Sequence, residues 1–481
     1  MARCFNLIDE KWILTSSGKV SLFDIFNDDV GSVGNLVGTP LEKISVFRFL
    51  LALIQRVWTP KNRDEWKSIS LHDMRCMVKE YLNECYDLFW LYDEERPFLQ
   101  VRSDYEKMLR FKPIHLFRIE TSDNMVITSD LQQTPDDITN EEKVRLLLVA
   151  LNFALAHKKW GDGRKVVPSA HTVGNGFVLV NLLGDSLLET LKFNMITREE
   201  LDNLKMFPYG LGIAPWETDI SFENEKELYR LRESYLGILV PLSRLVRFDF
   251  NSSNVWIGPG PVVYTNKEEE FDPFWLQIRD SNGNIIYKKT DVNKGIIKEL
   301  PALVEYSNSS VRSFILDSNL GYIYHIASGE YFGMFIGGIS FSSQSGGKYI
   351  SGSDDLLDST VKFPIEALSK EWLKSFKRDI EFVTELGERL YSSIKQYWLE
   401  MNRKNKQKKA IAERIAKKAS GEFWKVVTAK LDTIIESSLR ENLRERFCIE
   451  LNNETVSLYN TFCPQDTSKQ MKVWVKYAWF L

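Results

Sequence analysis

The sequence predicts an α+β protein, with a mixed body of short sheets and helices over residues 1–360 and a C-terminal four-helix bundle over residues 361–481. Three observations lead to this fold class. Strand-like runs alternate with helical patterns through most of the chain. From about Pro364 the pattern becomes helical, and four amphipathic stretches with short links favour an antiparallel bundle. A chain of 481 residues also exceeds one compact core, so two or three domains are expected.

The N-terminal third combines short strands with helices. Residues 1–30 are expected to form strands, with NLIDEKWILT followed by a Ser-Ser-Gly turn and KVSLFDIF. LEKISVFRFLLALIQRVW has the spacing of a buried helical stripe, and a second helix is predicted over HDMRCMVKEYLNECYDLFWLY, residues 72–92. Thr139 and Glu142 have the spacing of a capping box, so a third helix is expected over residues 141–160.

Residues 177–350 mix strand-like runs with shorter helices. Strands are expected in FVLVNLL, NVWIGPGPVVY, FWLQIRDSNGNIIYKK and GYIYHIA, and the SNGN turn at residues 281–284 is typical of a hairpin. A further hairpin is expected where YFGMFI runs into GGISFSSQSGGKYISGS. Its Gly-rich tip suits a reversal at positive φ or a close backbone approach, and Gln344 alone would be interpreted as a solvated turn residue.

The composition excludes several classes of protein. It is 44% hydrophobic and 27% charged, which indicates a globular chain, and its net charge of −4 argues against uniform coating of DNA but permits a local basic patch. No apolar run approaches the roughly eighteen residues of a membrane span, and the first residues lack a signal peptide, so a cytoplasmic location without a membrane partner is expected. The five cysteines form no C-x-x-C pair, so no zinc knuckle is indicated.

Catalytic motifs are also missing from the sequence. There is no H-E-x-x-H, G-x-S-x-G, Walker or G-x-G-x-x-G pattern. Asp93, Glu94 and Glu95 are expected in a solvated loop, and His325 is expected in the core. The sequence therefore predicts no enzyme, no cofactor and no metal site. A hydrolase or nuclease with dispersed catalytic residues stays open as the alternative, and metal-dependent nuclease activity of the isolated chain would favour it.

A Gly-rich basic loop follows the third predicted helix. KKWGDGRKVVPSAHTVGNG sets Arg164, Lys165 and two preceding lysines around Gly161 and Gly163. Basic side chains attract phosphates, and glycines let the backbone approach a groove closely. From this segment alone, a solvated surface loop that happens to contain several basic residues is the simpler interpretation.

A second basic feature lies in the helical tail. Residues 401–430 contain ten Lys and Arg against two acidic residues. The basic residues Lys406, Lys409, Arg414 and Lys418 accompany an apolar stripe at Ile411, Ile415, Ala419 and Phe423. Such a helix suits nucleic acid or an acidic partner surface, and a plain solvated face is the alternative. An assembly protein that binds an acidic partner would associate without nucleic acid and independently of salt, unlike a phosphate binder.

These features together resemble the large subunit of type I-E CRISPR Cascade, the CasA family. The opening NLIDEKWILTSSGKVSLFDIF is similar to the family's N-terminal signature, and ERPFLQ is similar to its P-F-[LM]-Q segment. The Gly-rich loop, SYLGILVPLSRLVRF, FDPFWLQ, the double-glycine hairpin and the helical tail follow in the family's order. The resemblance thus covers essentially the whole chain, and the order of these short motifs is its specific part.

The resemblance implies a non-enzymatic subunit of an RNA-guided surveillance complex. Pairing with the guide RNA reads most of the target, whereas protein reads the short protospacer-adjacent motif (PAM). The large subunit is expected to recognise the PAM in double-stranded DNA through the minor groove, whose code is degenerate, and to help open the duplex. Its expected partners are the other Cascade subunits, the guide RNA, the target DNA and a recruited helicase–nuclease, and the helical bundle is expected to contact the small subunits.

The family's wedge, a glutamine at the tip of a hairpin after a Gly-Gly pair, maps onto Gln344. Ser343, Ser345 and Lys348 are its neighbours on this hairpin, and either serine is an alternative wedge. Insertion into the base stack costs about a few kcal/mol of unstacking, which the guide–target pairing that follows offsets.

Three remaining family roles map onto other segments. The contacts to the PAM minor groove and phosphates map onto Gly161, Gly163, Arg164, Lys165 and Lys267. The loop that docks toward the guide RNA handle maps onto residues 121–137, with Leu131, Gln132 and Gln133. The basic residues Lys406, Lys409, Arg414 and Lys418 are expected to guide the displaced strand. Some family members hold a cysteine cluster that has no counterpart at residues 247–262, so no metal is expected there.

Overall fold

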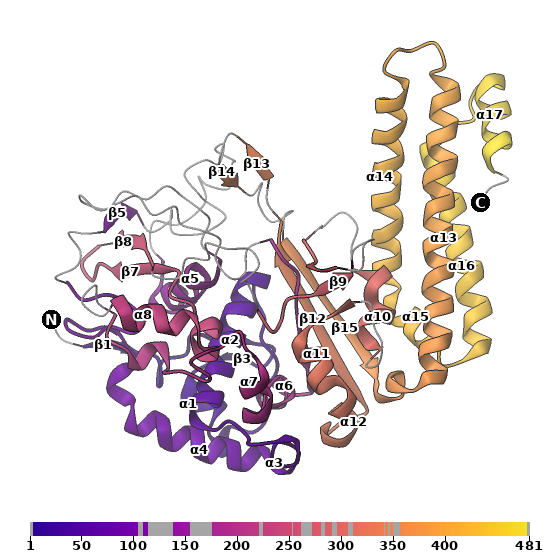
Figure 1. Ribbon diagram of the computed structural model, residues 1–481. Coiled ribbons are helices and arrows are strands. Elements are labelled where there is room, and N and C mark those ends of the chain that lie inside the picture. Colours follow the sequence, from indigo (N-terminus) through magenta and orange to yellow (C-terminus); the bar gives the residue numbers. More distant parts are fainter. Residues whose placement is uncertain are drawn as a thin grey trace. The chain divides into compact units, whose positions relative to one another are not determined.

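The computed structural model divides the chain into two compact units (Figure 1). The first contains Met1–Thr290 and Ser313–Thr360, and the second contains Asp291–Arg312 and Val361–Leu481. The structure describes residues 3–103, 109–113, 138–153, 176–220, 225–252, 254–260, 272–279, 284–290, 296–305, 311–340, 342–344, 347–349 and 356–478. The division into domains 1–360 and 361–481 stays a prediction.

The first unit opens with short strands and four helices. Up to residue 113 the elements are β1 (Cys4–Asn6), β2 (Ile13–Thr15), β3 (Gly18–Val20), α1 (Leu22–Ile25), α2 (Pro40–Val57), α3 (Arg63–Ser68), α4 (Leu71–Glu84), β4 (Trp90–Tyr92) and β5 (Arg110–Pro113). The strand expected in KVSLFDIF ends at Val20, because Ser21 and Asp24 form a reciprocal capping box that starts α1. The helix predicted to reach Tyr92 ends at Glu84, because β4 pairs with β1 instead.

The rest of the first unit alternates strands and helices. Its elements are α5 (Asn140–Phe153), β6 (Leu179–Leu183), α6 (Leu187–Phe193), α7 (Arg198–Asn203), α8 (Glu225–Arg232), α9 (Tyr235–Leu239), β7 (Arg244–Phe248), β8 (Asn254–Pro259), β9 (Gln277–Arg279), β10 (Ile285–Tyr287), α11 (Phe314–Asn319), α12 (Ile323–Ile326), β12 (Tyr331–Ile339), β13 (Ser342–Gln344), β14 (Gly347–Tyr349) and β15 (Leu356–Pro364). The strand expected in GYIYHIA is wrong, because this segment is helical. His325 is exposed rather than in the core. Asp93 is buried, whereas Glu94 and Glu95 are exposed as expected.

Helix α2 forms the centre of the first unit. It begins with Pro40 after a capping box between Thr39 and Glu42, and it packs against α4, α5, α6, α9 and β12. Because these neighbours cover it from several sides, every residue from Ile44 to Gln55 is buried, so the predicted helix is confirmed but is buried all round rather than along one stripe. Helix α5 begins as predicted, since the Glu142 N–H donates to Thr139 Oγ1 at 3.3 Å.

A three-stranded sheet in the order β15-β12-β6 places the predicted hairpin region. Strands β12 and β6 are antiparallel, with Gly333 opposite Leu183 and Gly337 opposite Leu179. All of β12 beyond Tyr331 is buried. The strands expected in FVLVNLL and YFGMFI are confirmed, as is the β9–β10 hairpin around the SNGN turn, of which residues 281–283 lie outside the described residues.

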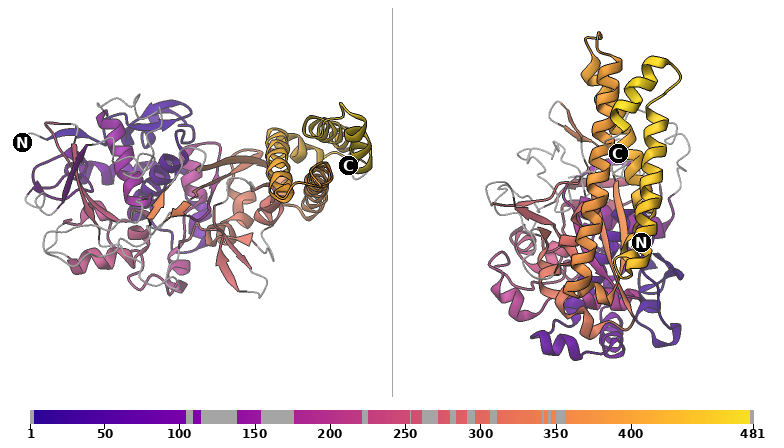
Figure 2. Two further views of the ribbon diagram at one scale, coloured as in Figure 1. Left: turned by 90° about the horizontal axis from the view of Figure 1, so that it is seen from above. Right: turned by 90° about the vertical axis from the view of Figure 1, so that its right-hand side faces the viewer.

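In its described residues the second unit is helical apart from β11 and the end of β15, residues 361–364. Its elements are α10 (Leu300–Val304), β11 (Val311–Arg312), α13 (Lys370–Met401), α14 (Lys408–Ala429), α15 (Leu431–Ser437), α16 (Glu441–Phe462) and α17 (Ser468–Ala478). Helices α13, α14 and α16 run side by side (Figure 2), and α15 is a short fifth helix between α14 and α16. A Cβ at Gly387 would lie 2.7 Å from the Phe423 ring, so this glycine allows α13 and α14 to pack closely. The predicted α+β fold class is confirmed.

The helical unit also contains a buried charge. The Asp379 side chain is 1% exposed and accepts hydrogen bonds from Arg444 Nε at 2.6 Å and Ser438 Oγ at 2.9 Å. These donors compensate the loss of hydration of the carboxylate. None of the helices in the described ranges has the length and apolar character required to cross a bilayer.

Candidate nucleic-acid interface

The predicted wedge hairpin is formed by β13 and β14. Their antiparallel register sets Ser343 opposite Lys348 and Gln344 opposite Gly347. Ser345 lies outside the described residues. Figure 1 shows this hairpin beyond the end of β12. The expected chain reversal is present, but the segment that returns through Tyr349 pairs with β13, while YFGMFI, in β12, pairs with β6 and with the later strand β15.

The Gly337–Gly338 pair at the end of β12 is explained by close packing. A Cβ at Gly337 would lie 2.7 Å from the Phe335 ring and 2.9 Å from Ile44 Cδ1. A Cβ at Gly338 would lie 2.5 Å from Thr290 Oγ1 and 2.8 Å from the carbonyl oxygen of Phe177. A Cβ at Gly337 would require the Phe335 and Ile44 side chains to shift, whereas a Cβ at Gly338 would meet a backbone carbonyl, so Gly338 is the position that requires glycine. The base of the hairpin is therefore held against α2 and against residues 177 and 290.

The Gly-rich basic loop, with Gly161, Gly163, Arg164 and Lys165, lies within 154–175, outside the described residues, but its two ends are described. It leaves α5 after a buried Phe153, close to where Ser243 Oγ donates to the carbonyl of Leu151. It returns at Gly176, whose carbonyl accepts from the Thr290 N–H at 3.0 Å. Thr290 is thus shared between the end of this loop and the base of the hairpin.

Lys267 also lies outside the described residues, within 261–271. The chain enters this segment at Gly260, whose N–H donates to the Ser243 carbonyl at 3.1 Å. It leaves the segment at Asp272, which is fully buried and forms an ion pair with Arg48 at 2.7 Å. Burial raises the pKa of Asp272, while Arg48 opposes the increase.

The two loops are therefore anchored at common places. The Gly-rich loop and the segment with Lys267 both start beside Ser243. The Gly-rich loop ends at Gly176, just before β6, and the segment with Lys267 ends just before Phe274, whose carbonyl accepts from the N–H of Val180 in β6 at 3.0 Å. Phe177, two residues before β6 begins, lies against Gly338 at the base of the hairpin. The structure thus brings together the anchors of three segments that the sequence assigned to PAM recognition. The guide-handle residues Leu131, Gln132 and Gln133 lie outside the described residues, and so do their neighbours in 114–137.

The predicted basic helix is α14, with Lys406 in the turn that precedes it. Lys409, Arg414 and Lys418 are exposed, as is Lys406. None of these four side chains has a hydrogen bond or ion pair with another described residue. The buried positions of the helix are Ala412, Ala416, Ala419, Phe423 and Val427. Of the predicted apolar stripe, Ala419 and Phe423 are buried, whereas Ile411 and Ile415 are half-buried at its edge.

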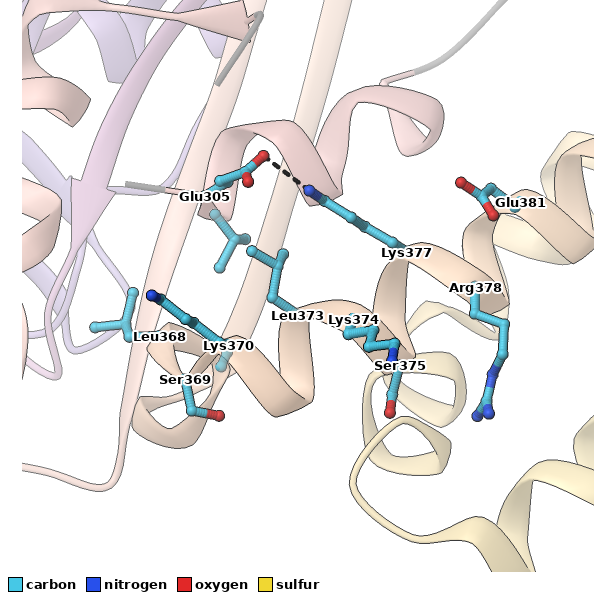
Figure 3. Close-up of a pocket in the computed structure, with 12 residues that line it drawn as sticks. Glu305, Leu368, Ser369, Lys370, Leu373, Lys374, Ser375, Lys377, Arg378 and Glu381 are labelled. Atoms are coloured by element: carbon cyan, nitrogen blue, oxygen red, sulfur yellow. Dashed lines mark hydrogen bonds and ion pairs between the residues drawn. The ribbon is translucent and has the colours of Figure 1, made fainter. Parts of the chain in front are cut away.

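A groove beside the first turns of α13 adds a basic surface that sequence reasoning missed (Figure 3). It is lined by Lys370, Lys374, Lys377, Arg378, Glu305 and Glu381, together with apolar and small residues. Lys377 Nζ contacts Glu305 at 2.9 Å, and Arg378 contacts Glu441 at 3.2 Å. The signal was present in the sequence, because Lys370, Lys374 and Arg378 recur every four residues along one helix face.

A unit of short sheets and helices and a second, helical unit with exposed cationic side chains on α14 define the class: a large α+β protein of two units. Residues 6–458 match the family described as CRISPR-associated protein Cse1, and the chain belongs to this family. Cse1, also called CasA, is the non-catalytic large subunit of type I-E Cascade. The family predicted from the order of the sequence motifs is confirmed.

Several relatives support the assignment. CasA/Cse1 of Thermus thermophilus is 24% identical over 324 residues, which span 64% of this chain and 61% of that relative. A crystal structure of CasA from Thermus thermophilus has a TM-score of 0.71 at 18% identity and covers 99% of this chain and 98% of its own. The structure of Thermobifida fusca Cse1 has a TM-score of 0.73 at 17% identity, with 99% and 96% covered. A chain from a CRISPR RNA-guided surveillance complex has a TM-score of 0.70 at 16% identity, with 99% of both chains covered. These solved structures share the fold of this chain.

Proposed function

We propose that the chain is the Cse1 subunit of a cytoplasmic CRISPR RNA-guided surveillance complex, where it recognises the PAM in double-stranded target DNA and helps open the duplex. It carries out no cleavage itself and offers a docking surface to a recruited helicase–nuclease. The guide RNA, the target DNA and the other Cascade subunits are its partners. Family membership supports the role in the complex, because one similar structure comes from an RNA-guided surveillance complex.

The shared anchoring of three segments supports PAM recognition most directly. The wedge hairpin, the Gly-rich basic loop and the segment with Lys267 all start or end on contacts among β6, Thr290, Ser243 and Gly338. Segments with adjacent anchors can act on one short stretch of duplex. In this proposal the glycine loop and Lys267 approach the minor groove and its phosphates, while the hairpin acts at the neighbouring base step.

A wedge has to be held firmly at its base, because it does mechanical work against base stacking. Residues 332–339 of β12 are buried, and a side chain at Gly338 would collide with the backbone carbonyl of Phe177. Displacement of this base would disturb α2 and β6, which form the centre of the unit. Tight packing thus supplies the rigidity that Gln344 needs to insert between bases.

The helical unit is proposed to follow the displaced strand and to contact the small subunits. Lys406, Lys409, Arg414 and Lys418 are free to bind phosphates, since they are exposed and make no ion pair within the described ranges. The groove with Lys370 and Lys374 offers more positive charge on α13. Leu131, Gln132 and Gln133 are proposed to dock toward the guide RNA handle on the strength of the family resemblance alone.

The experiment that tests this function compares the assembled guide-RNA complex with and without this subunit. Binding of a duplex with a matched target is measured with the PAM intact and with the PAM scrambled. The complex with the subunit is expected to require the PAM, and the complex without it is expected to lose this discrimination and most of its affinity. Equal target binding in the two complexes would refute the proposal, and metal-dependent cleavage by the isolated chain would favour the nuclease alternative.

A further inference from the structure

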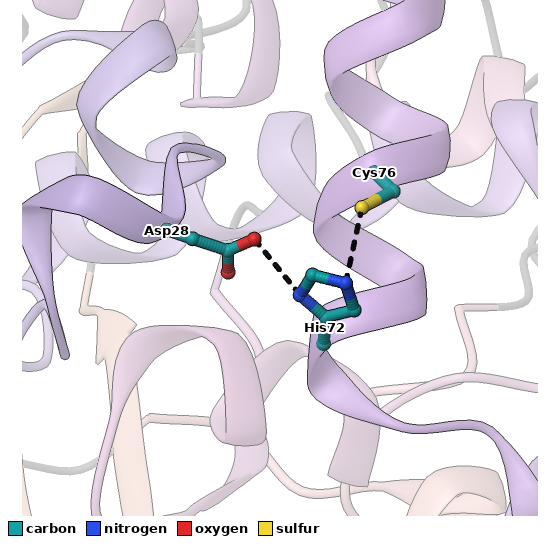
Figure 4. A group of neighbouring side chains, drawn as sticks. All are labelled: Asp28, His72 and Cys76. Carbon is teal, nitrogen blue, oxygen red and sulfur yellow. Dashed lines mark hydrogen bonds and ion pairs between the residues drawn. The ribbon is translucent and has the colours of Figure 1, made fainter.

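Three side chains that the nucleic-acid sites do not use lie together at the start of α4 (Figure 4). His72 and Cys76 are four residues apart on this helix, so they share one face. Asp28 comes from a short 3-10 turn before α2. His72 Nδ1 lies 2.8 Å from Asp28 Oδ2, and His72 Nε2 lies 3.6 Å from Cys76 Sγ.

Asp28 orients the imidazole of His72. One of its oxygens contacts Nδ1, and the other accepts from Arg75 Nη1 at 3.1 Å. A charged acceptor at Nδ1 favours the tautomer with a proton on that nitrogen, which leaves the lone pair of Nε2 directed toward Cys76.

The distance between Nε2 and Sγ matches a tetrahedral zinc site. Zinc binds imidazole nitrogen at about 2.0–2.1 Å and thiolate sulfur at about 2.3 Å, and a tetrahedral angle between them gives a nitrogen–sulfur separation of roughly 3.6 Å. The structure has 3.6 Å between these two atoms. Their spacing of four residues resembles the pairs of zinc ligands that other proteins place one helical turn apart.

We propose that His72 Nε2 and Cys76 Sγ chelate a zinc ion on the surface of the first unit, while Asp28 holds the imidazole from outside the coordination sphere. The His72 side chain is 66% exposed, so water would complete the coordination. Cys76 is the exposed member of the five cysteines; Cys463 is buried and the others are intermediate. This proposal departs from the sequence-based prediction of no metal site, which considered pairs of histidines and pairs of cysteines but not a His and a Cys one helical turn apart.

The test uses the full-length chain and two metals. Cobalt(II) reports thiolate coordination through a sulfur-to-metal charge-transfer band, and zinc affinity is obtained by competition with a chelating dye. The wild-type chain is expected to bind one equivalent of either metal and to show the band. Cys76→Ser should abolish the band and, like His72→Gln, weaken zinc binding at least ~10-fold, and Asp28→Asn should weaken it about 10-fold.

Matched controls separate this site from incidental binding. His325→Gln and Cys448→Ser remove the same side-chain types elsewhere and should leave the affinity unchanged. All variants should unfold at the wild-type temperature without metal, since the three side chains are exposed. Unchanged affinity in Cys76→Ser or His72→Gln would overturn the proposal. The proposal would also be overturned if Cys76 were alkylated equally fast in the presence and in the absence of zinc, because this would indicate a free thiol.

Discussion

The hairpin of the first unit and the basic helix of the second, both proposed to contact DNA, are built in opposite ways. The hairpin is positioned by a few close contacts between residues far apart in the sequence, such as Gly338 with Phe177 and Thr290. The basic helix is positioned by a repeated local pattern, with a small or apolar residue buried at nearly every turn. A single substitution should therefore disable the hairpin, whereas the charge of the helix is spread over several interchangeable residues.

The largest effect is expected at the buried charge of the helical unit. Asp379→Ala leaves the Arg444 guanidinium without its carboxylate, and such a loss costs about 3–5 kcal/mol of unfolding free energy. Glu385→Ala is the matched control on the same helix, since Glu385 is 67% exposed and pairs with Arg389 across 3.5 Å. The control should change stability by less than about 0.5 kcal/mol in urea unfolding. Equal losses in both variants would show that Asp379 does not hold the bundle together.

The next effect concerns the base of the hairpin. Gly338→Ala forces a Cβ to within 2.8 Å of a backbone carbonyl and should destabilise the first unit by about 1–3 kcal/mol. Gly421→Ala, in the middle of α14, meets nothing within 4 Å and should stabilise its helix by up to about 1 kcal/mol. Thermal unfolding of the two variants checks the opposite signs. A tolerated Gly338→Ala would mean that the hairpin base is not tightly held.

The same contrast explains how much the sequence could reveal. Elements with a strong local signal were predicted correctly, including α2 with its capping box and α13 with its long amphipathic pattern. Predictions failed where contacts between distant residues determine the secondary structure. Trp90–Tyr92 was predicted to be helical, but it forms strand β4 and pairs with β1, more than eighty residues earlier in the chain. The candidate hairpin was found from its glycines, but the partners that require those glycines, Phe177 and Thr290, leave no local pattern.

A smaller, graded effect is expected on the basic helix. Replacement of Lys406, Lys409, Arg414 and Lys418 by Gln should weaken binding of single-stranded DNA to the complex. It should also flatten the slope of log affinity against log salt by up to about 2.8, or roughly 0.7 per lost contact. The matched control replaces four exposed lysines of the first unit, Lys11, Lys61, Lys205 and Lys226. If the two variants have the same slope, α14 does not follow a strand and the helix is a plain solvated face.

The smallest effect is a pH dependence in the first unit. Burial would raise the pKa of Asp93, but the backbone N–H groups of Arg96 and Glu95 and the Arg3 side chain outweigh it, so the pKa is lowered. A lowered pKa stabilises the fold above the unfolded value of about 3.9, and this stability is lost as pH falls through the folded value. Asp93→Asn should cost about 1 kcal/mol at pH 7 and remove part of the acid sensitivity below about pH 4. Glu95→Gln, at an exposed neighbour, should reproduce the wild-type pH profile of unfolding.

In the proposed function, Gln344, on a hairpin with a rigid base, opens the duplex beside the PAM. The most direct measurement follows R-loop formation by the assembled complex on a PAM-containing duplex, with wild-type subunit, Gln344→Ala and the control Gln407→Ala in the helical unit. Gln344→Ala is expected to bind PAM DNA normally but to form open R-loops at least ~10-fold more slowly, while Gln407→Ala should match wild type. Wild-type opening by Gln344→Ala would contradict the claim and make Gln344 an ordinary turn residue.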